Sequence, residues 1–484
     1  MNDSQSWQNA LDAFRRIWGY DNFRPPQGEI VRALIESRDA LIVMPTGGGK
    51  SICFQLPALL KTGLTLIVSP LVALMENQVQ ELRDRSLPAS LLHSQIPKQQ
   101  RRQTFNLLQR NKLRLLYLSP ETLFSQPVWE TLSQPQIEIN GLILDEAHCL
   151  VQWGDTFRPA YRRLGAVRPA LLKCKPAGTK IAIAAFTATA DPKAQRTIKN
   201  VLKLQKPKQF VLNPYRSNLS LNVKAICTPR SRRQQLFKFI KPRKSEAGLV
   251  YVRTRKDSEY LAELLEDEAG YNTAAYHAGL SAEERREIEK VWLEGEMKFV
   301  VCTSAFGMGI NHPHVRWVIH FQAPMLLSEY IQEVGRGGRD GKSAEALTLI
   351  SEPTGWLDPE DKTRWKFLED NLRSQYRSAQ KLVKKLPSSG EINAVVDEFP
   401  EAAIALSLLH SSGQLKWRDP FRYVINKSAA SVSVNSDNFA AVKETKKYLT
   451  TSQCRWQFLL AAFGFIKEAK NMRCGRCDNC KKSS

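Results

Sequence analysis

The sequence predicts an α/β protein with two tandem parallel-sheet lobes, a mainly helical region after them, and a C-terminal module built around cysteines. Three observations lead to this prediction. Short apolar runs alternate with helical stretches in two successive series, the pattern changes to helices after about residue 352, and four of the nine cysteines crowd near the C-terminus. The expected domains are residues 1–212, 213–352, 353–440 and 441–484.

Charge is the unusual feature of the composition. The 484 residues include 70 Lys and Arg against 48 Asp and Glu, which gives a formal net charge of +22. Such an excess indicates a polyanionic partner, either nucleic acid or an anionic membrane, although a generally basic surface without a dedicated partner is the alternative. No apolar run is long enough to span a membrane, and the N-terminus lacks the apolar core of a secretory signal. We therefore expect a cytoplasmic protein, associated with the nucleoid if it is prokaryotic.

The first lobe is predicted from five β-branched or apolar runs between residues 38 and 205. These runs are DALIVM, LTLIVS, LRLLYLS, GLILDE and IAIAAF. The second lobe is predicted from a later series, GLVYV, NTAAYH, KFVVCT, VRWVIHF and EALTLIS. Runs of this length separated by helical stretches are typical of βαβ units with helices on both faces of a parallel sheet. The polar segment 213–222 is expected to connect the two lobes.

The region after residue 352 is predicted to contain three short helices and a hairpin. Apolar positions recur at helical spacing in YRSAQKLVKKL, GEINAVVDEF and EAAIALSLLHSSG, and LKWRDPFRYVIN can turn at Asp419–Pro420. This order suits a winged helix-turn-helix, and a plain three-helix bundle fits it equally well. The following SAASVSVNSDN is expected to be a linker.

A glycine-rich octet, MPTGGGKS, links an apolar run to a predicted helix at residues 44–51. Backbone N–H groups of such a turn converge on one point and favour an anion, while a lysine and a hydroxyl serve the terminal phosphates and Mg²⁺. Met44 stands where the usual pattern has its first glycine, and a purely structural turn is the alternative. We expect ATP phosphates to bind at Thr46, Gly47, Gly48, Gly49, Lys50 and Ser51.

Two further motifs strengthen the prediction of an NTPase. Asp145 and Glu146 end an apolar strand, so that Asp145 can hold Mg²⁺ together with Ser51 and Glu146 can activate the attacking water. Arg336 and Arg339, in GRGGRD, are expected to share one face of a helical turn and to stabilise charge on the transferred phosphoryl group. Lys50, Glu146 and the two arginines are therefore the predicted catalytic residues.

The C-terminal cysteines have the spacing of a metal site. Two overlapping C-x₂-C steps and one remote cysteine can close a tetrahedral site of four sulfurs, which leaves no position open for water and so indicates a structural zinc ion. A redox C-x-x-C is the alternative. The expected zinc ligands are Cys454, Cys474, Cys477 and Cys480.

An aromatic stretch, QWGDTFRPAY, follows the Asp-Glu motif. Exposed rings interleaved with arginine form a stacking platform for unpaired bases, whereas a buried cluster is the alternative. The residues expected to form this platform are Trp153, Phe157, Arg158 and Tyr161, and the family resemblance described next implies that they bind DNA.

These motifs, in this order, resemble the RecQ family of superfamily 2 DNA helicases over roughly residues 10 to 350, and the cysteines extend the resemblance to the C-terminus. The resemblance implies two RecA-like lobes and an ATP-, Mg²⁺- and Zn²⁺-dependent enzyme. Such an enzyme translocates 3′ to 5′ on single-stranded DNA and unwinds duplex or branched DNA in repair and recombination. Protein partners are not indicated, and a monomer is the default expectation.

The resemblance also assigns roles to residues outside the motifs already described. An adenine-recognising segment is implied by Tyr20, Arg24 and Gln27. Coupling of hydrolysis to movement is implied by Thr187, Thr189, Gly307, Gly309 and Asn311. For the five of these residues in lobe 1 there are plainer interpretations. Tyr20, Arg24 and Gln27 can simply belong to a helix start, and Thr187 and Thr189 to a threonine-rich strand end.

The sequence departs from the family in three ways. Asp155 and Thr156 replace a usual His-Asp pair, and Asn311 replaces a usual acid, so the coupling of DNA binding to hydrolysis is in question. The longer members carry a winged helix and a helical accessory domain after the zinc module, so this chain is expected to be a short form. We expect residues 372–428 to contain a winged-helix-like unit moved upstream. At its hairpin, residues suited to contact duplex DNA, or to pack on the zinc module instead, are Trp417, Arg418, Phe421, Arg422 and Tyr423.

Two other functions fit the same motifs. An RNA-directed ATPase of the same superfamily is one, because the catalytic motifs do not select the sugar. A DNA-binding scaffold with weak ATPase activity and no unwinding is the other, because of the altered Asp155–Thr156 pair.

Overall fold

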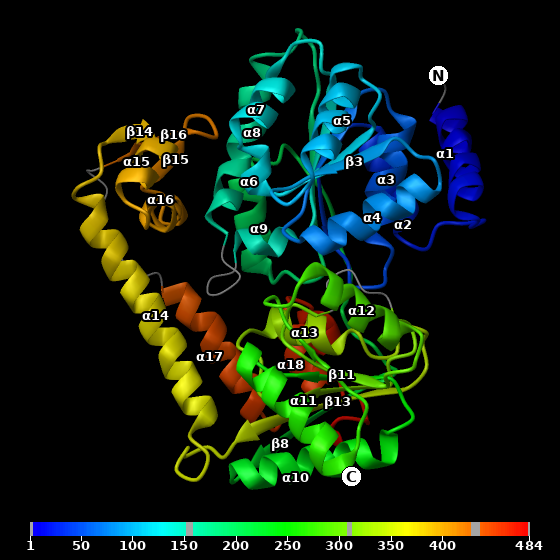
Figure 1. Cartoon of the computed structure of the whole chain (residues 1–484), viewed down its shortest axis with the longest axis vertical. Coiled ribbons are helices and arrows are strands. Elements are labelled where there is room, and N and C mark those ends of the chain that lie inside the picture. The colour runs from blue at the N-terminus through cyan, green and yellow to red at the C-terminus, as the bar shows by residue number, and fades with distance from the viewer. Residues whose placement is uncertain (1–2, 152–157, 307–311, 427–435, 483–484) are drawn as a thin grey trace. The chain divides into compact units, whose positions relative to one another are not determined.

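The computed structural model describes residues 3–151, 158–306, 312–426 and 436–482. It divides into two compact units, which Figure 1 shows in chain colours from blue to red. The first consists mainly of lobe 1, residues 1–212, together with residues 371–435. The second consists mainly of lobe 2, residues 213–370, together with the chain from residue 436 onward.

Lobe 1 contains a seven-stranded, fully parallel sheet in the order β3-β4-β2-β5-β6-β1-β7. Its strands are β1 Ala40–Val43, β2 Leu64–Val68, β3 Ala89–Leu92, β4 Leu115–Leu118, β5 Ile139–Leu144, β6 Ala182–Thr187 and β7 Lys208–Val211. Its helices are α1 Asp3–Trp18, α2 Gln27–Ile35, α3 Lys50–Leu60, α4 Val72–Asp84, α5 Lys98–Gln109, α6 Pro120–Leu123, α7 Gln126–Ser133, α8 Val167–Leu172 and α9 Pro192–Val201, with the 3₁₀ helices η1 Ala147–Leu150 and η2 Pro159–Ala166. The five strands expected from the sequence form, and β3 and β7 are additional.

Both faces of this sheet are buried. Leu41 and Val43 of β1 belong to one hydrophobic cluster, whereas Ala40 and Ile42 belong to another. Because successive side chains of a strand point to opposite faces, two separate clusters along one strand mean two covered faces. This explains why the strands read as unbroken apolar runs in the sequence.

A buried carboxylate, Asp39, ties the start of β1 to the elements around it. Its two oxygens accept hydrogen bonds from Arg168 of α8, each at 2.8 Å. They also accept the backbone N–H groups of Ile183, at 2.8 Å, and Gln205, at 2.6 Å. Asp39 is 5% exposed and Arg168 is 6% exposed, so the pair is shielded from water. One side chain thereby fixes β1, β6 and the segment after α9.

Lobe 2 contains a six-stranded parallel sheet in the order β10-β11-β9-β12-β13-β8. Its strands are β8 Leu219–Ile226, β9 Gly248–Tyr251, β10 Ala275–Tyr276, β11 Phe299–Cys302, β12 Trp317–His320 and β13 Ala344–Ser351. Its helices are α10 Pro229–Ile240, α11 Arg255–Ala269, α12 Ala282–Leu293 and α13 Leu327–Val334, with the 3₁₀ turn η3 Lys241–Arg243. The segment expected only to connect the lobes ends inside β8, which pairs with β13 along eight residues. β8 was missed because polar residues interrupt its apolar pattern.

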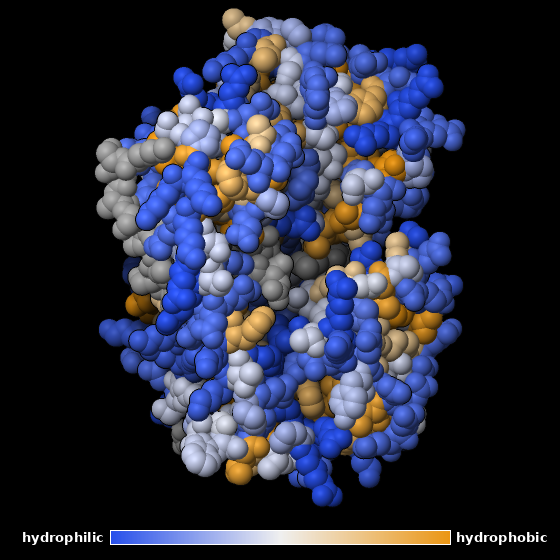
Figure 2. All heavy atoms as spheres, turned by 60° about the vertical axis from the view of Figure 1, so that its left-hand side comes forward, coloured by the Kyte–Doolittle hydropathy of each residue, from blue (hydrophilic) through white to orange (hydrophobic). Residues whose placement is uncertain are grey.

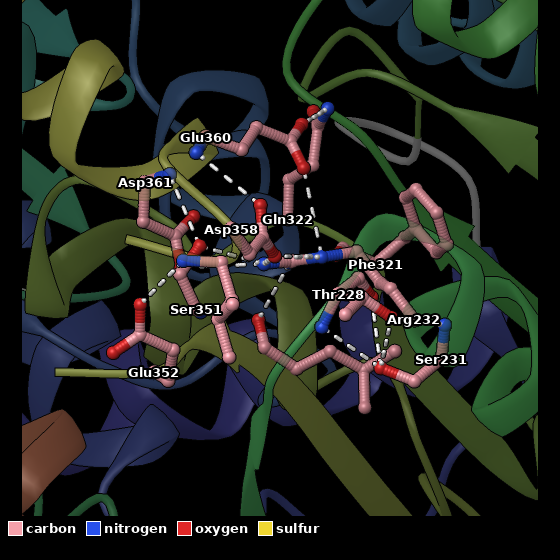
Figure 3. A network of polar contacts seen from close by, with 12 residues as sticks. Thr228, Ser231, Arg232, Phe321, Gln322, Ser351, Glu352, Asp358, Glu360 and Asp361 are labelled. Carbon is pink, nitrogen blue, oxygen red and sulfur yellow. Dashed lines mark hydrogen bonds and ion pairs between the residues drawn. The ribbon is translucent and has the colours of Figure 1, made fainter. Parts of the chain in front are cut away.

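A buried arginine on α10 organises the end of the lobe 2 sheet (Figure 3). Arg232 is 1% exposed and pairs with Asp358, which is fully buried, at 2.6 Å. It also donates to the carbonyl of Phe321 at 2.7 Å and to the hydroxyl of Ser351 at 2.9 Å. Asp361 in turn accepts the backbone N–H of Ser351 at 2.6 Å. These contacts attach the segment that begins the next helix to lobe 2.

A long helix, α14 Glu360–Val383, begins in the second unit and ends in the first. It is followed by β14 Ser389–Glu391, α15 Ile392–Glu398, α16 Ala402–Ser411, β15 Leu415–Trp417 and β16 Arg422–Ile425. The three strands form an antiparallel sheet in the order β14-β16-β15, and the segment has a hydrophobic cluster that also includes Ala166 of η2. We call residues 371–426 the inserted unit. Three helices and a three-stranded antiparallel sheet are the set of elements expected of a winged helix.

The chain returns to the second unit at α17 Ser436–Thr450 and continues through α18 Arg455–Ala462, α19 Ile466–Ala469 and α20 Asp478–Lys482. These helices pack on the edge strand β8. The indole of Trp456 donates to the carbonyl of Leu219 at 3.1 Å, and Asp478 accepts the N–H of Val223 at 3.2 Å. The free edge of the lobe 2 sheet is therefore covered by the C-terminal segment.

The surface is hydrophilic over most of the face seen in Figure 2, with only scattered hydrophobic residues, as the large net charge leads one to expect. Among the described residues, no helix has the combination of length and apolar character needed to cross a membrane.

Removal of the Asp39 carboxylate is expected to destabilise lobe 1. Asp39→Ala leaves the buried Arg168 guanidinium and two backbone N–H groups without their acceptor, which should cost about 3–5 kcal/mol of unfolding free energy. Thermal or denaturant unfolding followed by circular dichroism measures the loss. The matched control is Asp84→Ala on the exposed end of α4, which should change stability by less than about 0.5 kcal/mol. Equal stability of the two variants would contradict the role given to Asp39.

Candidate functional site: the phosphate loop, the arginine turn and the cysteine cluster

The glycine-rich loop joins β1 to the first turn of α3. Gly47 and Gly49 have φ of +81° and +75°, a left-handed conformation that favours glycine. A side chain at Gly49 would also displace the amide group of Gln27, because its Cβ would collide with the amide nitrogen. The loop therefore presents bare backbone at the start of α3, where unsatisfied N–H groups and the helix dipole favour a phosphate. Lys50 donates to the carbonyl of Met44 at 3.3 Å, which holds its ammonium group beside the loop.

Of the residues expected to recognise adenine, Gln27 lies next to this loop. The Gln27 amide nitrogen donates to the carbonyl of Gly48 at 2.9 Å, and its oxygen accepts the backbone N–H of Arg24 at 3.0 Å. An amide has two N–H donors and two acceptor lone pairs, so each end of Gln27 keeps one position for a ligand. Arg24 is exposed, and Tyr20 is 53% exposed with its ring 5.8 Å from that of Phe14. This segment thus offers the exposed ring of Tyr20 and the amide of Gln27, which is only 5% exposed.

The two carboxylates at the end of β5 are almost completely buried. Asp145 is 5% exposed and Glu146 is 9% exposed. Burial raises the pKa of Asp145 to about 7, the neighbouring Glu146 adds to the rise, and the ammonium of Lys50 opposes it. Two carboxylates held together in a buried site favour a cation between or beside them. The carboxylate oxygens, and the hydroxyl of Ser51 directly after Lys50, are ligands of the kind that Mg²⁺ prefers.

A histidine that the sequence analysis did not single out joins two motifs of lobe 1. His148, in η1, lies 3.1 Å from the carboxylate of Glu146 and 3.2 Å from the hydroxyl of Thr187 through the same ring nitrogen. The Thr187 hydroxyl in turn donates to the carbonyl of Thr189 at 3.0 Å. A chain of polar contacts therefore leads from the carboxylate at the end of β5 to the end of β6. Its position directly after Asp-Glu-Ala was the available signal for His148.

Arg336 and Arg339 do not lie on one helix as expected. α13 ends at Val334, and both arginines follow in an irregular turn in which Gly338 has φ of +58°. They nevertheless line the same small cavity of lobe 2, together with Trp292 and His312. Burial lowers the pKa of Arg339 to about 9, and the charge of Arg336 contributes. Two crowded cations in a buried site favour an anionic ligand.

The helix that carries this turn is fixed from inside lobe 2. Glu333, at the end of α13, pairs with Arg253 through both carboxylate oxygens, at 2.9 and 3.3 Å, and with His320 at 2.9 Å. Burial alone would raise the pKa of Glu333, but the Arg253 guanidinium and His320 lower it to about 2. The carboxylate is therefore charged at neutral pH and holds α13 on the lobe 2 sheet.

The residues expected to bind DNA divide into three groups. Trp153 and Phe157 lie outside the described residues. Arg158 precedes η2 and forms an ion pair with Glu121 of α6 at 3.5 Å, with more than a third of its side chain exposed. Tyr161 is completely buried in the core of lobe 1, so the expectation that its ring stacks on bases is wrong. For Tyr161 the alternative given in the sequence analysis, a buried cluster, is the correct one.

Of the predicted coupling residues, Thr187 and Thr189 are described, and both are buried. Gly307, Gly309 and Asn311 lie outside the described residues, as do Asp155 and Thr156.

The aromatic residues of the β15–β16 hairpin are packed, not presented to DNA. Trp417 is 7% exposed and Tyr423 is fully buried, both in the cluster of the inserted unit. Phe421 packs edge-to-face on Trp129 and Phe124 of lobe 1, with ring centres 5.3 and 6.2 Å apart. The interpretation of these rings as a wedge is therefore wrong, and so is the alternative that they pack on the zinc module. Of the five residues named at this hairpin, Arg418 and Arg422 are exposed.

The four C-terminal cysteines form a site that fits zinc. Their sulfur atoms all lie within 4.8 Å of one another, and those of Cys474 and Cys480 are 3.9 Å apart. Four sulfurs around Zn²⁺ at about 2.3 Å would be separated by roughly 3.8 Å. Backbone N–H groups point at three of the sulfurs, Cys454, Cys474 and Cys477, at 3.3–3.5 Å, which favours thiolates. No redox pair needs four converging thiols, so the geometry favours the metal site.

Comparison with known protein families defines the class. Residues 24–198 match the DEAD/DEAH box helicase family, and residues 231–341 match the helicase conserved C-terminal domain. A solved structure of Mycobacterium smegmatis helicase Lhr bound to ssDNA and AMP-PNP superimposes with a TM-score of 0.56. It is 19% identical and covers 92% of this chain and 62% of that chain. The two parallel-sheet lobes thus have the RecA-like fold of superfamily 2 helicases.

The family within this class follows from the C-terminus and from whole-chain similarity. Residues 419–481 match the RecQ zinc-binding family. The chain is 51% identical to the ATP-dependent DNA helicase RecQ of Synechocystis over 99% of both chains. It is 36% identical to the RecQ helicase of Pasteurella multocida over 79% of this chain and 57% of that one. The chain belongs to the RecQ family of ATP-dependent DNA helicases, whose cofactors are ATP, Mg²⁺ and Zn²⁺.

Loss of one cysteine is expected to release the zinc. Cys477→Ser removes a fully buried ligand, so purified protein should fall from about one zinc per chain to substantially less, with a lower unfolding temperature. Atomic emission spectroscopy measures the metal content. Cys174→Ser, at an exposed cysteine outside the cluster, should keep its zinc. Full zinc occupancy in Cys477→Ser would contradict the ligand assignment.

Proposed function

We propose that this protein is a 3′-to-5′ DNA helicase that couples ATP hydrolysis to translocation on single-stranded DNA and to duplex unwinding, in DNA repair and recombination. The observation that carries the proposal is the polar chain from Glu146 through His148 to Thr187. It gives the carboxylate suited to activate water a direct connection to the end of the neighbouring strand β6. A change at Glu146 during hydrolysis can thereby be transmitted to Thr187 at the end of β6.

The roles at the nucleotide follow from the chemistry of each group. Lys50 neutralises the β- and γ-phosphates, and backbone N–H groups from Gly47 to Ser51 bind phosphate oxygens, with Thr46 preceding them in the loop. Asp145 and Ser51 hold Mg²⁺, which supplies charge stabilisation at the transferred phosphoryl group. Glu146 orients and deprotonates the attacking water.

Adenine recognition is assigned to the segment before α2. The remaining donor and acceptor of Gln27 suit the amino group and ring nitrogen of adenine, and the exposed Tyr20 ring suits stacking. Because Gln27 also holds the Gly48 carbonyl, base recognition and the shape of the phosphate loop are linked. Arg24 contributes its backbone to this arrangement.

Arg336 and Arg339 act as the charge-stabilising groups contributed by lobe 2. Their crowding in one cavity and the lowered pKa of Arg339 support an anionic partner. Movement of lobe 2 relative to lobe 1 during the ATP cycle then alternates the grip on DNA.

DNA contact is assigned to Trp153, Phe157 and Arg158, now without Tyr161. Arg158 suits a phosphate, and the two rings suit unpaired bases. Gly307, Gly309 and Asn311 are proposed to transmit hydrolysis in lobe 2, as Thr187 and Thr189 do in lobe 1. Single-stranded and branched DNA are the proposed substrates of a monomer, and the cytoplasm or nucleoid the proposed location.

Removal of the phosphate-loop lysine is expected to separate hydrolysis from DNA binding. Lys50→Ala should reduce DNA-stimulated ATP turnover at least about 100-fold, because a charge that stabilises the transition state is lost. Binding of a labelled single-stranded oligonucleotide should be largely unchanged. Lys112→Ala, at an exposed lysine after α5, is the matched control and should retain activity. Turnover in Lys50→Ala near that of the control would contradict the assignment.

Polarity and sugar preference are tested with one set of duplexes. With ATP and Mg²⁺, a duplex with a 3′ DNA tail should be unwound faster than one with a 5′ tail, because the motor must load on the strand along which it moves. A 3′ RNA tail of equal length should support less ATP turnover than the DNA tail. Faster unwinding from the 5′ tail would refute the polarity, and preferential stimulation by RNA would support an RNA-directed ATPase. ATP turnover without any strand displacement would support a scaffold.

A further inference from the structure

Two consecutive arginines of η2 are buried under the inserted unit. Arg162 is 4% exposed and Arg163 is 9% exposed, and burial lowers the pKa of each to about 10. Arginine is rarely buried unless its guanidinium is held by specific partners. The segment also has a notable position in the chain, because η2 directly follows the stretch assigned to DNA contact, and Arg158 is its N-cap residue.

Arg163 connects lobe 1 with the hairpin of the inserted unit. Its Nε donates to the carbonyl of Pro420 at 2.6 Å, in the turn between β15 and β16. Its guanidinium carbon lies 4.2 Å from the ring centre of Phe124 in lobe 1 and 5.7 Å from that of Phe421 in the hairpin. The Arg163 side chain thus contacts one ring of lobe 1 and one ring of the hairpin, and it donates a hydrogen bond to the hairpin turn.

The helices of the inserted unit contact the same segment. The Ser407 hydroxyl of α16 lies 3.4 Å from the carbonyl of Pro159, at the beginning of η2. Ala166, the last residue of η2, packs in the hydrophobic cluster of the inserted unit. The inserted unit therefore contacts η2 near its start and at its end.

Within lobe 1, η2 is held by α6 and the residue that follows it. Glu121 pairs with Arg158 at 3.5 Å, and Phe124 stacks on Arg163. Arg158 and Arg163 are thus held by the same short segment of lobe 1. A change at the hairpin contact of Arg163 can pass to Phe124, along α6 to Glu121, and from Glu121 to Arg158.

Stability alone does not account for arginine at this position. A buried guanidinium loses its hydration, and an apolar side chain of similar volume packs as well or better. What arginine adds is direction, because a planar guanidinium with a charge-assisted hydrogen bond fixes the position of the hairpin turn relative to η2. A directional contact of this kind is suited to keeping the hairpin in one fixed position relative to η2.

We propose that Arg163 is a positioning residue that fixes the inserted unit on η2 and thereby holds Arg158 in place for DNA. This inference rests on the proposed function, because it assumes that DNA stimulates ATP hydrolysis. In this proposal the inserted unit affects the response to DNA indirectly, through Arg163. Its aromatic residues are buried and do not insert between bases.

The test compares basal and DNA-stimulated ATP turnover in full-length variants. Arg163→Met keeps volume and apolar packing but removes the bond to Pro420. It should leave basal turnover unchanged and raise the oligonucleotide concentration for half-maximal stimulation about tenfold, with the unfolding temperature unchanged or higher. Arg163→Lys should show a smaller rise, because lysine keeps the charge but lacks the planar guanidinium. Arg110→Met, at an exposed arginine after α5, should match the wild type.

Phe421→Leu approaches the contact from the hairpin side and should also raise the half-stimulation concentration. An unchanged value in both Arg163→Met and Phe421→Leu would overturn the inference. A parallel fall of basal turnover, stimulated turnover and unfolding temperature would also overturn it, because Arg163 would then be only structural. A wild type whose ATP turnover ignores DNA would overturn the proposed function itself, and this result is distinguishable from the other two.

Discussion

The parallel pairing of β5, β6 and β1 is the constraint on which the proposed nucleotide site of lobe 1 depends. Leu144 pairs with Ala185, and Val43 pairs with Thr187, so the three strands end at the same edge of the lobe 1 sheet. The N–H of Met44 then donates to the carbonyl of Thr187 at 2.9 Å, which joins the start of the phosphate loop to the end of β6. The loop, the two carboxylates and the threonine motif come from positions about 100 and 40 residues apart in the chain, and only this register brings them together. Asp39 supports two of these strands, β1 and β6, from their opposite end.

The sequence was most informative where one local pattern determines the structure. Runs buried on both faces of a sheet are continuous in the sequence, so most strands of both lobes were predictable. β8 was not, because an edge strand covered by a segment more than 200 residues away alternates buried and polar positions. Likewise, the cysteine spacing indicated the metal site directly, since the ligands themselves carry the chemistry.

The local sequence pattern could not predict which side chains are exposed and which are buried. Tyr161, Trp417 and Tyr423 are aromatic residues beside arginines, a composition equally typical of a nucleic-acid surface and of a packed interface. Only the tertiary structure shows that they are buried. In the same way, the spacing of Arg336 and Arg339 suggested a helix, but α13 ends before them and the glycines allow a turn that directs both into one cavity.

The covering of β8 has a consequence for how the protein is made. The Val223 N–H and the Leu219 carbonyl of this strand are satisfied by residues of α20 and α18 that lie more than 230 positions later in the chain. During synthesis these residues emerge from the ribosome on the order of tens of seconds after β8. Throughout that interval the nascent second lobe carries an open sheet edge, the kind of surface on which chains aggregate. Arrival of the cysteine module, with its metal, closes that edge, so zinc supply during translation bears on the yield of folded protein as well as on the finished fold.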